Sequence, residues 1–248
     1  MTNICKNCDN NFEGNFCNHC GQAADTHKVT MHFIWHDLQH GLFHFDNGIF
    51  YTLKQLLTRP GNTIREFIDG KRVRHFKPLS LVVVLATLYG LFYHFFFDKI
   101  YDVKPLNSIE NVSGVYENMI KWSTDHFAYS SLISILIITV VSYFVFKKQG
   151  RNFAEHLVLN TFFTGLTLVV SFIFLSVFYL SDSEAILKWY AFINLFINFA
   201  LMCWCYIQFF NKLPKIKSFG LTIRTYIIVN CINITIGFIV GWAISSAQ

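Results

Sequence analysis

The sequence predicts an all-α integral membrane protein that carries a small metal-binding head at its N-terminus. Charged residues make up only 14 % of its 248 residues, against about 25 % in ordinary soluble domains. The mean hydropathy is +0.40, and long apolar runs begin at residue 78. Two Cys-x-x-Cys pairs precede these runs. We therefore expect a zinc-ribbon-like knuckle at 1–25, cytoplasmic interfacial amphipathic helices at 26–77 and a five-helix transmembrane bundle at 78–248.

The N-terminal cysteines have the spacing of a structural zinc site. Cys5 and Cys8 form one pair, and Cys17 and Cys20 form the other. Two such pairs complete the tetrahedron of four thiolates that Zn²⁺ favours, and metal binding would supply the folding energy of so short a segment. Disulfides or a redox motif are the alternatives, which a reducing compartment disfavours. Lys6 is the only Lys or Arg between the first and last of these cysteines, a poor match for nucleic acid.

Residues 29–57 have the spacing of an amphipathic helix, with an expected break near residues 46–48. Four histidines recur at every fourth position on one flank, so adjacent members are neighbours. Histidines at i and i+4 can share a metal, which makes a second metal or pH-sensing site one interpretation. The other is an interfacial helix lying on the bilayer, with imidazoles facing water or headgroups. The four residues are His32, His36, His40 and His44.

A short helix is expected between this segment and the first apolar run. Pro60 breaks what precedes it, and Thr63 and Glu66 have the spacing of a capping box. The helix should therefore cover residues 64–69. Gly70 is a natural end because glycine accepts positive φ.

Basic residues follow this helix directly and precede the first apolar run. Such residues beside a span mark the cytoplasmic side. They either fix the topology alone or form a specific site for a lipid phosphate or a partner. They are Lys71, Arg72, Arg74 and Lys77.

Five apolar runs have the length of a membrane span. Lys and Arg gather before the first run and in every second connection after it, whereas the other connections are more acidic. This alternation places the N-terminus in the cytoplasm and the C-terminus outside. The runs cover residues 78–97, 127–146, 157–180, 189–210 and 225–244.

No run contains Asp, Glu, Lys or Arg. Ion-coupled transporters usually keep a charged residue in mid-membrane, and hydrolases need an acid–base or metal set, so an enzyme is the less favoured class. Asparagines in the runs predict interhelical hydrogen bonds, with a polar substrate cavity as the alternative. Gly237 and Gly241 indicate close helix packing. The asparagines are Asn160, Asn194, Asn198, Asn230 and Asn233.

Several motifs resemble the family called domain of unknown function 3667. The resemblance implies a bacterial inner-membrane protein with a zinc-ribbon-like N-terminus and Arg-Pro-Gly and Gly-Lys-Arg motifs before its first span, and it implies no activity. Asp9 stands where a glycine is more usual. More distantly, the plan is similar to Yip-type five-span proteins. The matching residues are the four N-terminal cysteines with Gly21 and Gln22, Thr52 and Leu53, Arg59 to Gly61, Ile64 to Phe67, Gly70 to Arg72, Pro78, and Asn152 to Leu157.

We expect a non-enzymatic anchor that recruits or senses a protein partner at the cytoplasmic face, in contact with membrane lipids and able to form a homo-oligomer. The alternative is a transporter or enzyme that handles lipid phosphate at the same face. In that case guanidinium groups would hold the phosphate, since they donate two bonds at once, and nearby residues would supply acid–base chemistry. The candidate site residues are Arg59, Arg65, Lys71, Arg72, Glu155 and His156.

Overall fold

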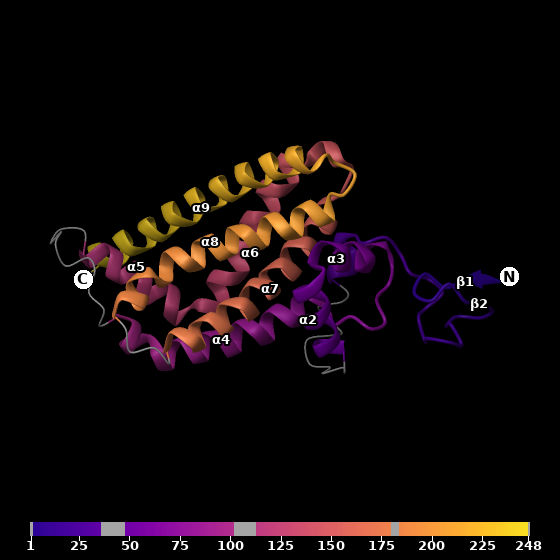
Figure 1. The fold of residues 1–248 in the computed structure, drawn as a ribbon, viewed down its shortest axis with the longest axis horizontal. Coiled ribbons are helices and arrows are strands. Elements are labelled where there is room, and N and C mark those ends of the chain that lie inside the picture. Colours follow the sequence, from indigo (N-terminus) through magenta and orange to yellow (C-terminus); the bar gives the residue numbers. More distant parts are fainter. Residues whose placement is uncertain (1, 36–47, 102–112, 180–183, 248) are drawn as a thin grey trace.

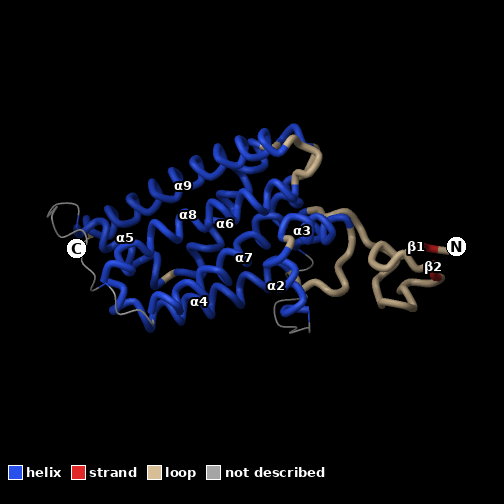
Figure 2. The backbone as a smooth tube through the Cα atoms, in the orientation of Figure 1, coloured by secondary structure: helices blue, strands red, loops and turns tan. Residues whose placement is uncertain are grey.

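The computed structural model describes residues 2–35, 48–101, 113–179 and 184–247. Long helices lie along one axis as a bundle, and the N-terminal head projects from one end (Figure 1). The N- and C-termini lie at opposite ends of the molecule. Apart from the head, the described chain is helical with short loops (Figure 2), as the predicted all-α class requires.

The head contains the two described strands, β1 (Asn3–Ile4) and β2 (Asn11–Phe12). They pair antiparallel, with Asn3 opposite Phe12 and Ile4 opposite Asn11. Phe12 is buried against Cys5 and Cys17 in a small core of its own, separate from the core of the bundle. So small a core is consistent with a head that depends on a metal for its folding.

Two short helices form the end of the bundle that faces the head: α2 (Gly48–Thr58) and α3 (Pro60–Asp69). The predicted start of the second helix at residue 64 is wrong, because Pro60 occupies the first helical turn, where its missing N–H costs nothing. The predicted capping box does not form. The Thr63 hydroxyl instead donates to the Arg59 carbonyl at 2.9 Å. The Glu66 carboxylate accepts hydrogen bonds from Nη1 and Nη2 of Arg59 at 2.9 and 3.1 Å. Gly70 ends the helix as predicted, with φ of 122°.

The bundle comprises α4 (Pro78–Tyr101), α6 (Phe127–Val145), α7 (Phe153–Tyr179), α8 (Glu184–Phe209) and α9 (Lys215–Ser246). Four helices of the described chain are long and apolar enough to cross a membrane: Phe127–Val145, Phe153–Ser176, Phe192–Phe209 and Lys215–Ser246. The described apolar part of α4, Pro78–Phe92, is shorter. The described residues thus support four of the five predicted spans.

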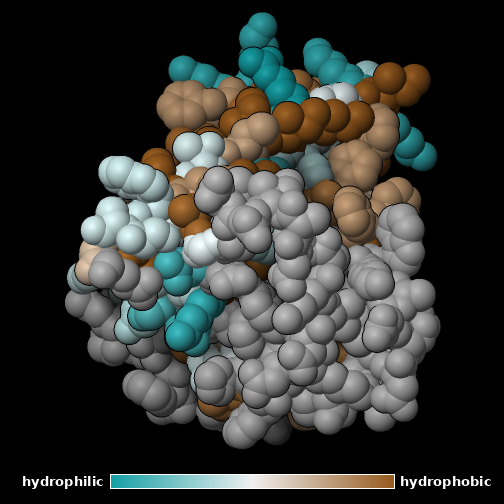
Figure 3. All heavy atoms as spheres, turned by 90° about the vertical axis from the view of Figure 1, so that its left-hand side faces the viewer, coloured by the Kyte–Doolittle hydropathy of each residue, from teal (hydrophilic) through white to brown (hydrophobic). Residues whose placement is uncertain are grey.

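Burial distinguishes a central helix from a peripheral one. In the apolar stretch of α7, 56 % of the residues are buried, against 11 % in the apolar stretch of α9. Most of α9 therefore presents apolar side chains outward, including Ile234, Ile239 and Trp242. Figure 3, viewed from the end that carries the C-terminus, shows brown hydrophobic side chains over the upper part of the molecule, where α9 lies, with teal hydrophilic ones at its top edge. An apolar exterior of this kind suits contact with lipid tails.

The predicted close packing at Gly241 is confirmed. Helix α5 (Ser113–Asp125) lies against α9, and a Cβ atom added to Gly241 would meet the carbonyl oxygen of Val115 at 2.3 Å. The small residues of α9 therefore permit this close approach. The predicted interhelical hydrogen bonds are confirmed for Asn160 and Asn233, whereas Asn198 and Asn230 donate to carbonyls of their own helices. Asn160 makes interhelical hydrogen bonds to Ser142 and Thr139 of α6, at 2.9 and 3.3 Å.

Candidate metal centre and the basic cleft beside it

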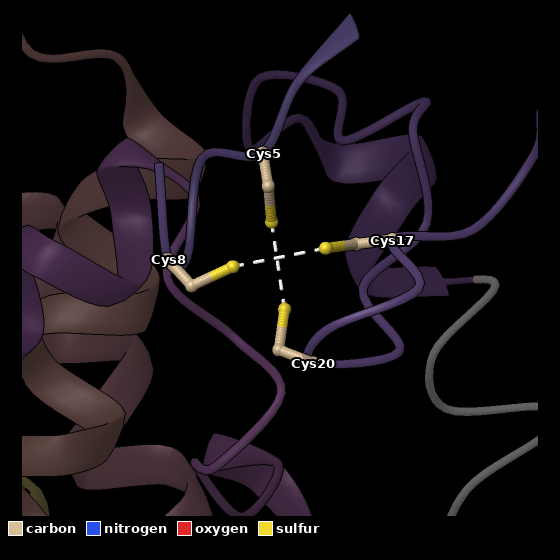
Figure 4. Close-up of side chains that lie close together, drawn as sticks. All are labelled: Cys5, Cys8, Cys17 and Cys20. Carbon is tan, nitrogen blue, oxygen red and sulfur yellow. Dashed lines mark hydrogen bonds between the residues drawn. The ribbon is translucent and has the colours of Figure 1, made fainter. Parts of the chain in front are cut away.

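The four N-terminal cysteines converge on one point. Their Sγ atoms all lie within 4.8 Å of one another. Cys5 and Cys20 are 3.5 Å apart and Cys8 and Cys17 are 3.7 Å apart, with all four side chains directed toward a common centre (Figure 4). Four sulfurs around Zn²⁺ at bonds of about 2.3 Å would be separated by about 3.8 Å, whereas a disulfide requires about 2.05 Å. The cluster therefore fits a tetrahedral metal site and is not a pair of disulfides.

Each pair of cysteines sits in a tight turn closed by a backbone hydrogen bond. The Asp9 N–H donates to the Cys5 carbonyl at 2.9 Å, and the Gly21 N–H donates to the Cys17 carbonyl at 2.8 Å. Asp9 and Gly21 thus occupy equivalent positions, with φ of 58° and 77°. The aspartate adopts the left-handed conformation that glycine favours, a cost of about 1–2 kcal/mol that does not prevent the turn.

The peptide groups of the second turn favour the thiolate form of Cys17. Burial opposes ionisation, but hydrogen bonds from the N–H groups of Cys20 and His19 and from the Cys8 and Cys5 thiols lower the pKa of Cys17 below its usual value. A thiolate is the form that binds a metal, so these hydrogen bonds favour the coordinating form of Cys17. The donor set of four thiolates suits Zn²⁺ among the common metals.

The segment that follows the cysteines is fastened to the bundle by Arg72 and Asn152. The Arg72 guanidinium donates to the His27 carbonyl at 2.9 Å and to the Phe67 carbonyl at 3.2 Å. The same group lies 4.4 Å from the ring centroid of Phe33. Asn152, at the start of α7, donates to the Val29 carbonyl at 3.0 Å. Arg72 therefore connects the head to the bundle.

A cleft of about 640 Å³ opens where the head meets the bundle. Its walls come from the head, from α3, from the segment that begins α7 and from the end of α8. Five of the lining residues are Lys or Arg, and two are acidic. The lining residues are Lys6, His27, Lys28, Arg65, Ile68, Asp69, Gln149, Gly150, Arg151, Glu155, Phe209, Phe210, Asn211 and Lys212.

Two of the six residues predicted for a phosphate or partner site line this cleft: Arg65 and Glu155. Arg59 instead forms an ion pair with Glu66, and Lys71 is exposed outside the cleft. Arg72 forms the contacts to the segment after the head described above.

His156 lies inside the bundle, away from the lining of the cleft. It is fully buried, and its Nδ1 atom is 3.0 Å from the Ser142 hydroxyl. In the predicted histidine row, His32 is exposed, whereas His36, His40 and His44 lie outside the described residues.

The sequence did not single out Lys6, Lys28, Arg151 and Lys212 as site residues. Arg151 and Lys212 lie in the basic connections between apolar runs, and Lys6 lies between Cys5 and Cys8. Their only local signal is a positive charge next to a motif or a span end. Residues 6 and 212 approach one cleft because the chain folds back on itself, which no local pattern reveals.

Fold and site together define a helical membrane protein with a four-cysteine head at one end. Residues 46–90 match the family model described as Protein of unknown function (DUF3667). This match confirms the expected resemblance over α2, α3 and the first part of α4, and it leaves the cysteines and the later helices outside. No curated protein matches the chain, and no solved structure does.

Proposed function

We propose that this protein is a non-enzymatic docking module of the bacterial inner membrane, in which a zinc-bound cytoplasmic head recruits or senses a protein partner. One observation carries the proposal: a four-thiolate cluster that fits Zn²⁺ sits in a head fastened to a membrane bundle. Four protein ligands leave no open coordination position, which is the arrangement of structural rather than catalytic zinc. The metal would therefore hold the shape of the head.

The topology with five spans and a cytoplasmic head rests on three supports. Helix α4 has 24 residues, or about 36 Å at 1.5 Å per residue, enough to cross a hydrocarbon core of about 30 Å. It packs along α7. The termini lie at opposite ends of the bundle (Figure 1), which an odd number of crossings requires. The basic residues of the loops gather at the end that carries the head, as cytoplasmic loops do.

The partner surface would lie on the head itself. Ile4 and Phe16 are 71 % and 65 % exposed, although both are large apolar residues. Apolar anchors of this kind dominate binding energy when a partner covers them. If Ile4 and Phe16 served only to stabilise the head, we would expect them to be buried beside Phe12.

Site-specific crosslinking in membranes tests the docking function. A photo-crosslinking residue in place of Phe16 should yield a discrete adduct with a protein partner. The adduct should disappear when Cys17→Ser and Cys20→Ser are added, because the head then loses its metal-dependent shape. Cys231→Ser is the matched control, since this exposed thiol of α9 lies outside the cluster. An adduct that survives loss of both ligands would reject the proposal.

Metal content tests the zinc assignment separately. The purified full-length protein should contain one zinc per chain, and Cys17→Ser should lower this content strongly while Cys231→Ser leaves it unchanged. Elemental analysis measures both. Another metal at the same stoichiometry, or equal content in the two variants, would contradict the assignment.

A second candidate, handling of lipid phosphate at the cytoplasmic interface, is favoured by the basic cleft. Arg65 and Glu155 lie in it, but Arg59 and Arg72 are engaged elsewhere. The part of this hypothesis that the basic cleft still supports is the binding of an anion.

A further inference from the structure

We infer that the cleft between the head and the bundle is a binding site for a phosphate-type oxyanion, and that the metal-bound head forms one of its walls. This inference goes beyond the docking function, because the ligand, the residues and the readout are different. It rests on the charge in the cleft, on its position and on the way Lys6 is held.

The acidic residues of the cleft are already engaged. Arg151 lies 3.4 Å from the Asp69 carboxylate and 3.8 Å from the Glu155 carboxylate. Glu155 also accepts a hydrogen bond from the Asn152 N–H at 3.0 Å. Arg151 therefore shares its single charge between two carboxylates. Neither carboxylate forms an ion pair with Arg65 or with a lysine of the cleft.

The other Lys and Arg side chains of the cleft have no acidic partner among the described residues. Arg65 donates to the carbonyls of Gln208 and Phe209, both neutral groups, and also to the Asn62 amide. Lys6 donates to the Thr26 carbonyl at 2.7 Å. Lys28 and Lys212 form neither an ion pair nor a hydrogen bond with any residue that the structure describes.

Four positive groups thus face one cleft, whereas its two carboxylates are associated with Arg151. Like charges in a partly enclosed, low-dielectric cleft repel one another, and an anion between them relieves that repulsion. Lys and Arg donors with free N–H groups are the usual ligands of phosphate oxygens. The volume of about 640 Å³ lies within the range of ligand sites, about 300–1,000 Å³.

The position of the cleft allows two sources for the anion. The cleft is lined by Phe209 at the end of α8 and by Glu155 in the first turn of α7. It therefore lies at the level where one apolar helix ends and another begins. Both an anionic lipid headgroup and a free phosphate compound reach that level. The two share the phosphate group that the cleft would recognise, and experiment can separate them.

The head contributes directly to the site. Lys6 follows the ligand Cys5, and its side chain lies against Gly70, where a Cβ atom would be 2.9 Å from the Lys6 Cδ. A metal that folds the turn around Cys5 therefore also places Lys6. Loss of the metal should free Lys6 and the neighbouring segment at Lys28, leaving the cleft with cations from the bundle alone.

The test uses the full-length protein in phosphatidylcholine nanodiscs. In one arm, equilibrium dialysis measures binding of radiolabelled inorganic phosphate. In the other, native mass spectrometry counts phosphatidic acid retained from nanodiscs that contain it at one molecule in ten. Lys28→Gln with Lys212→Gln should weaken binding by about tenfold or more. Lys71→Gln with Lys148→Gln is the matched control, since it removes two exposed charges outside the cleft.

Binding in the phosphate arm identifies a free phosphate compound as the ligand class, and binding in the lipid arm alone identifies a headgroup; both support the site. Cys17→Ser should weaken the same binding by a comparable factor, because the head no longer holds Lys6. Equal binding by the cleft variant and its control, binding in neither arm, or full binding by Cys17→Ser would overturn the inference.

Discussion

The side-chain oxygen of Gln22 accepts a hydrogen bond from the backbone N–H of Arg72 at 3.2 Å. Gln22 is only 5 % exposed and follows the cysteine turn directly, whereas Arg72 belongs to the turn after α3. This contact links segments 50 residues apart and fixes the head to the bundle. The backbone carbonyl of Gln22 also accepts a hydrogen bond from the Cys17 N–H at 2.8 Å, so Gln22 bridges the second cysteine turn and the bundle.

Arg72→Lys should release the segment between the head and the bundle. The ammonium group cannot reproduce the guanidinium contacts to the His27 and Phe67 carbonyls or the contact with the Phe33 ring. We expect tryptic cleavage after Lys28 to accelerate by about tenfold, since cleavage requires local opening. Lys71→Gln, at the adjacent exposed position, should leave the rate unchanged. Equal rates in the two variants would show that Arg72 does not hold this segment.

Gly61→Ala should destabilise the protein strongly. A Cβ atom at this position would lie 2.1 Å from the Cys205 carbonyl oxygen and 2.5 Å from the Phe209 nitrogen, so α3 and α8 would have to separate. The expected loss is about 2–3 kcal/mol, measured as a lower unfolding temperature in detergent. Gly220→Ala is the control, because nothing lies within 4 Å of its added Cβ and alanine is the better helix former by about 1 kcal/mol. A lower unfolding temperature for the control than for Gly61→Ala would contradict the packing argument.

His75 should make stability depend on pH. Burial lowers the pKa of His75 to about 4, with opposing effects from Glu66 and Arg59. The folded-state pKa is therefore below the unfolded value of 6.5. The contribution of His75 to the free energy of unfolding is constant above pH 6.5 and falls as the pH drops from 6.5 toward 4. His75→Phe keeps the ring contacts with Tyr51 and Phe67 and should flatten this fall. Unfolding temperatures at pH 7 to 4.5 provide the measurement, and parallel curves for the two proteins would refute the prediction.

Asn160 should be coupled energetically to Tyr206. The Tyr206 hydroxyl donates to the Asn160 side-chain oxygen inside the bundle, where both residues are fully buried. Asn160→Leu removes the side-chain oxygen that accepts this hydroxyl and should cost about 1–3 kcal/mol. Adding Tyr206→Phe should recover part of the loss, and a double-mutant cycle measures the coupling. Strict additivity of the two changes would show that the hydrogen bond contributes nothing.

Features encoded within a few residues were predictable from the sequence. The four cysteines lie within one short segment, so their spacing predicts that their sulfurs converge, as they do. Gly70 ends α3 because its backbone tolerates a φ that other residues avoid, and Gly241 permits close helix packing because it lacks a side chain. The family resemblance around Arg59 to Arg72 was likewise visible in local motifs, and the match to residues 46–90 bears it out.

Charged side chains were the least predictable, because local spacing does not determine which of several nearby groups each one contacts. Thr63 and Glu66 had the spacing of a capping box, yet Glu66 accepts the Arg59 guanidinium and Pro60 starts the helix. An ion pair with a guanidinium offers the carboxylate two charge-assisted hydrogen bonds, more than one backbone N–H provides. Local spacing therefore predicted the backbone as a partner for Glu66, whereas the Arg59 guanidinium, one turn away, binds it more strongly.

By itself, the sequence determined that this chain has apolar helices long enough to cross a membrane and a four-cysteine head, because hydropathy and cysteine spacing are properties of contiguous residues. Only the tertiary structure decided which charges share a site. Lys6, Arg65 and Lys212 come from three distant segments and meet in one cleft, whereas Arg72 holds the segment after the head. The physical reason is that a long side chain reaches whatever the fold brings within a few ångströms, and chain folding over many residues sets that neighbourhood.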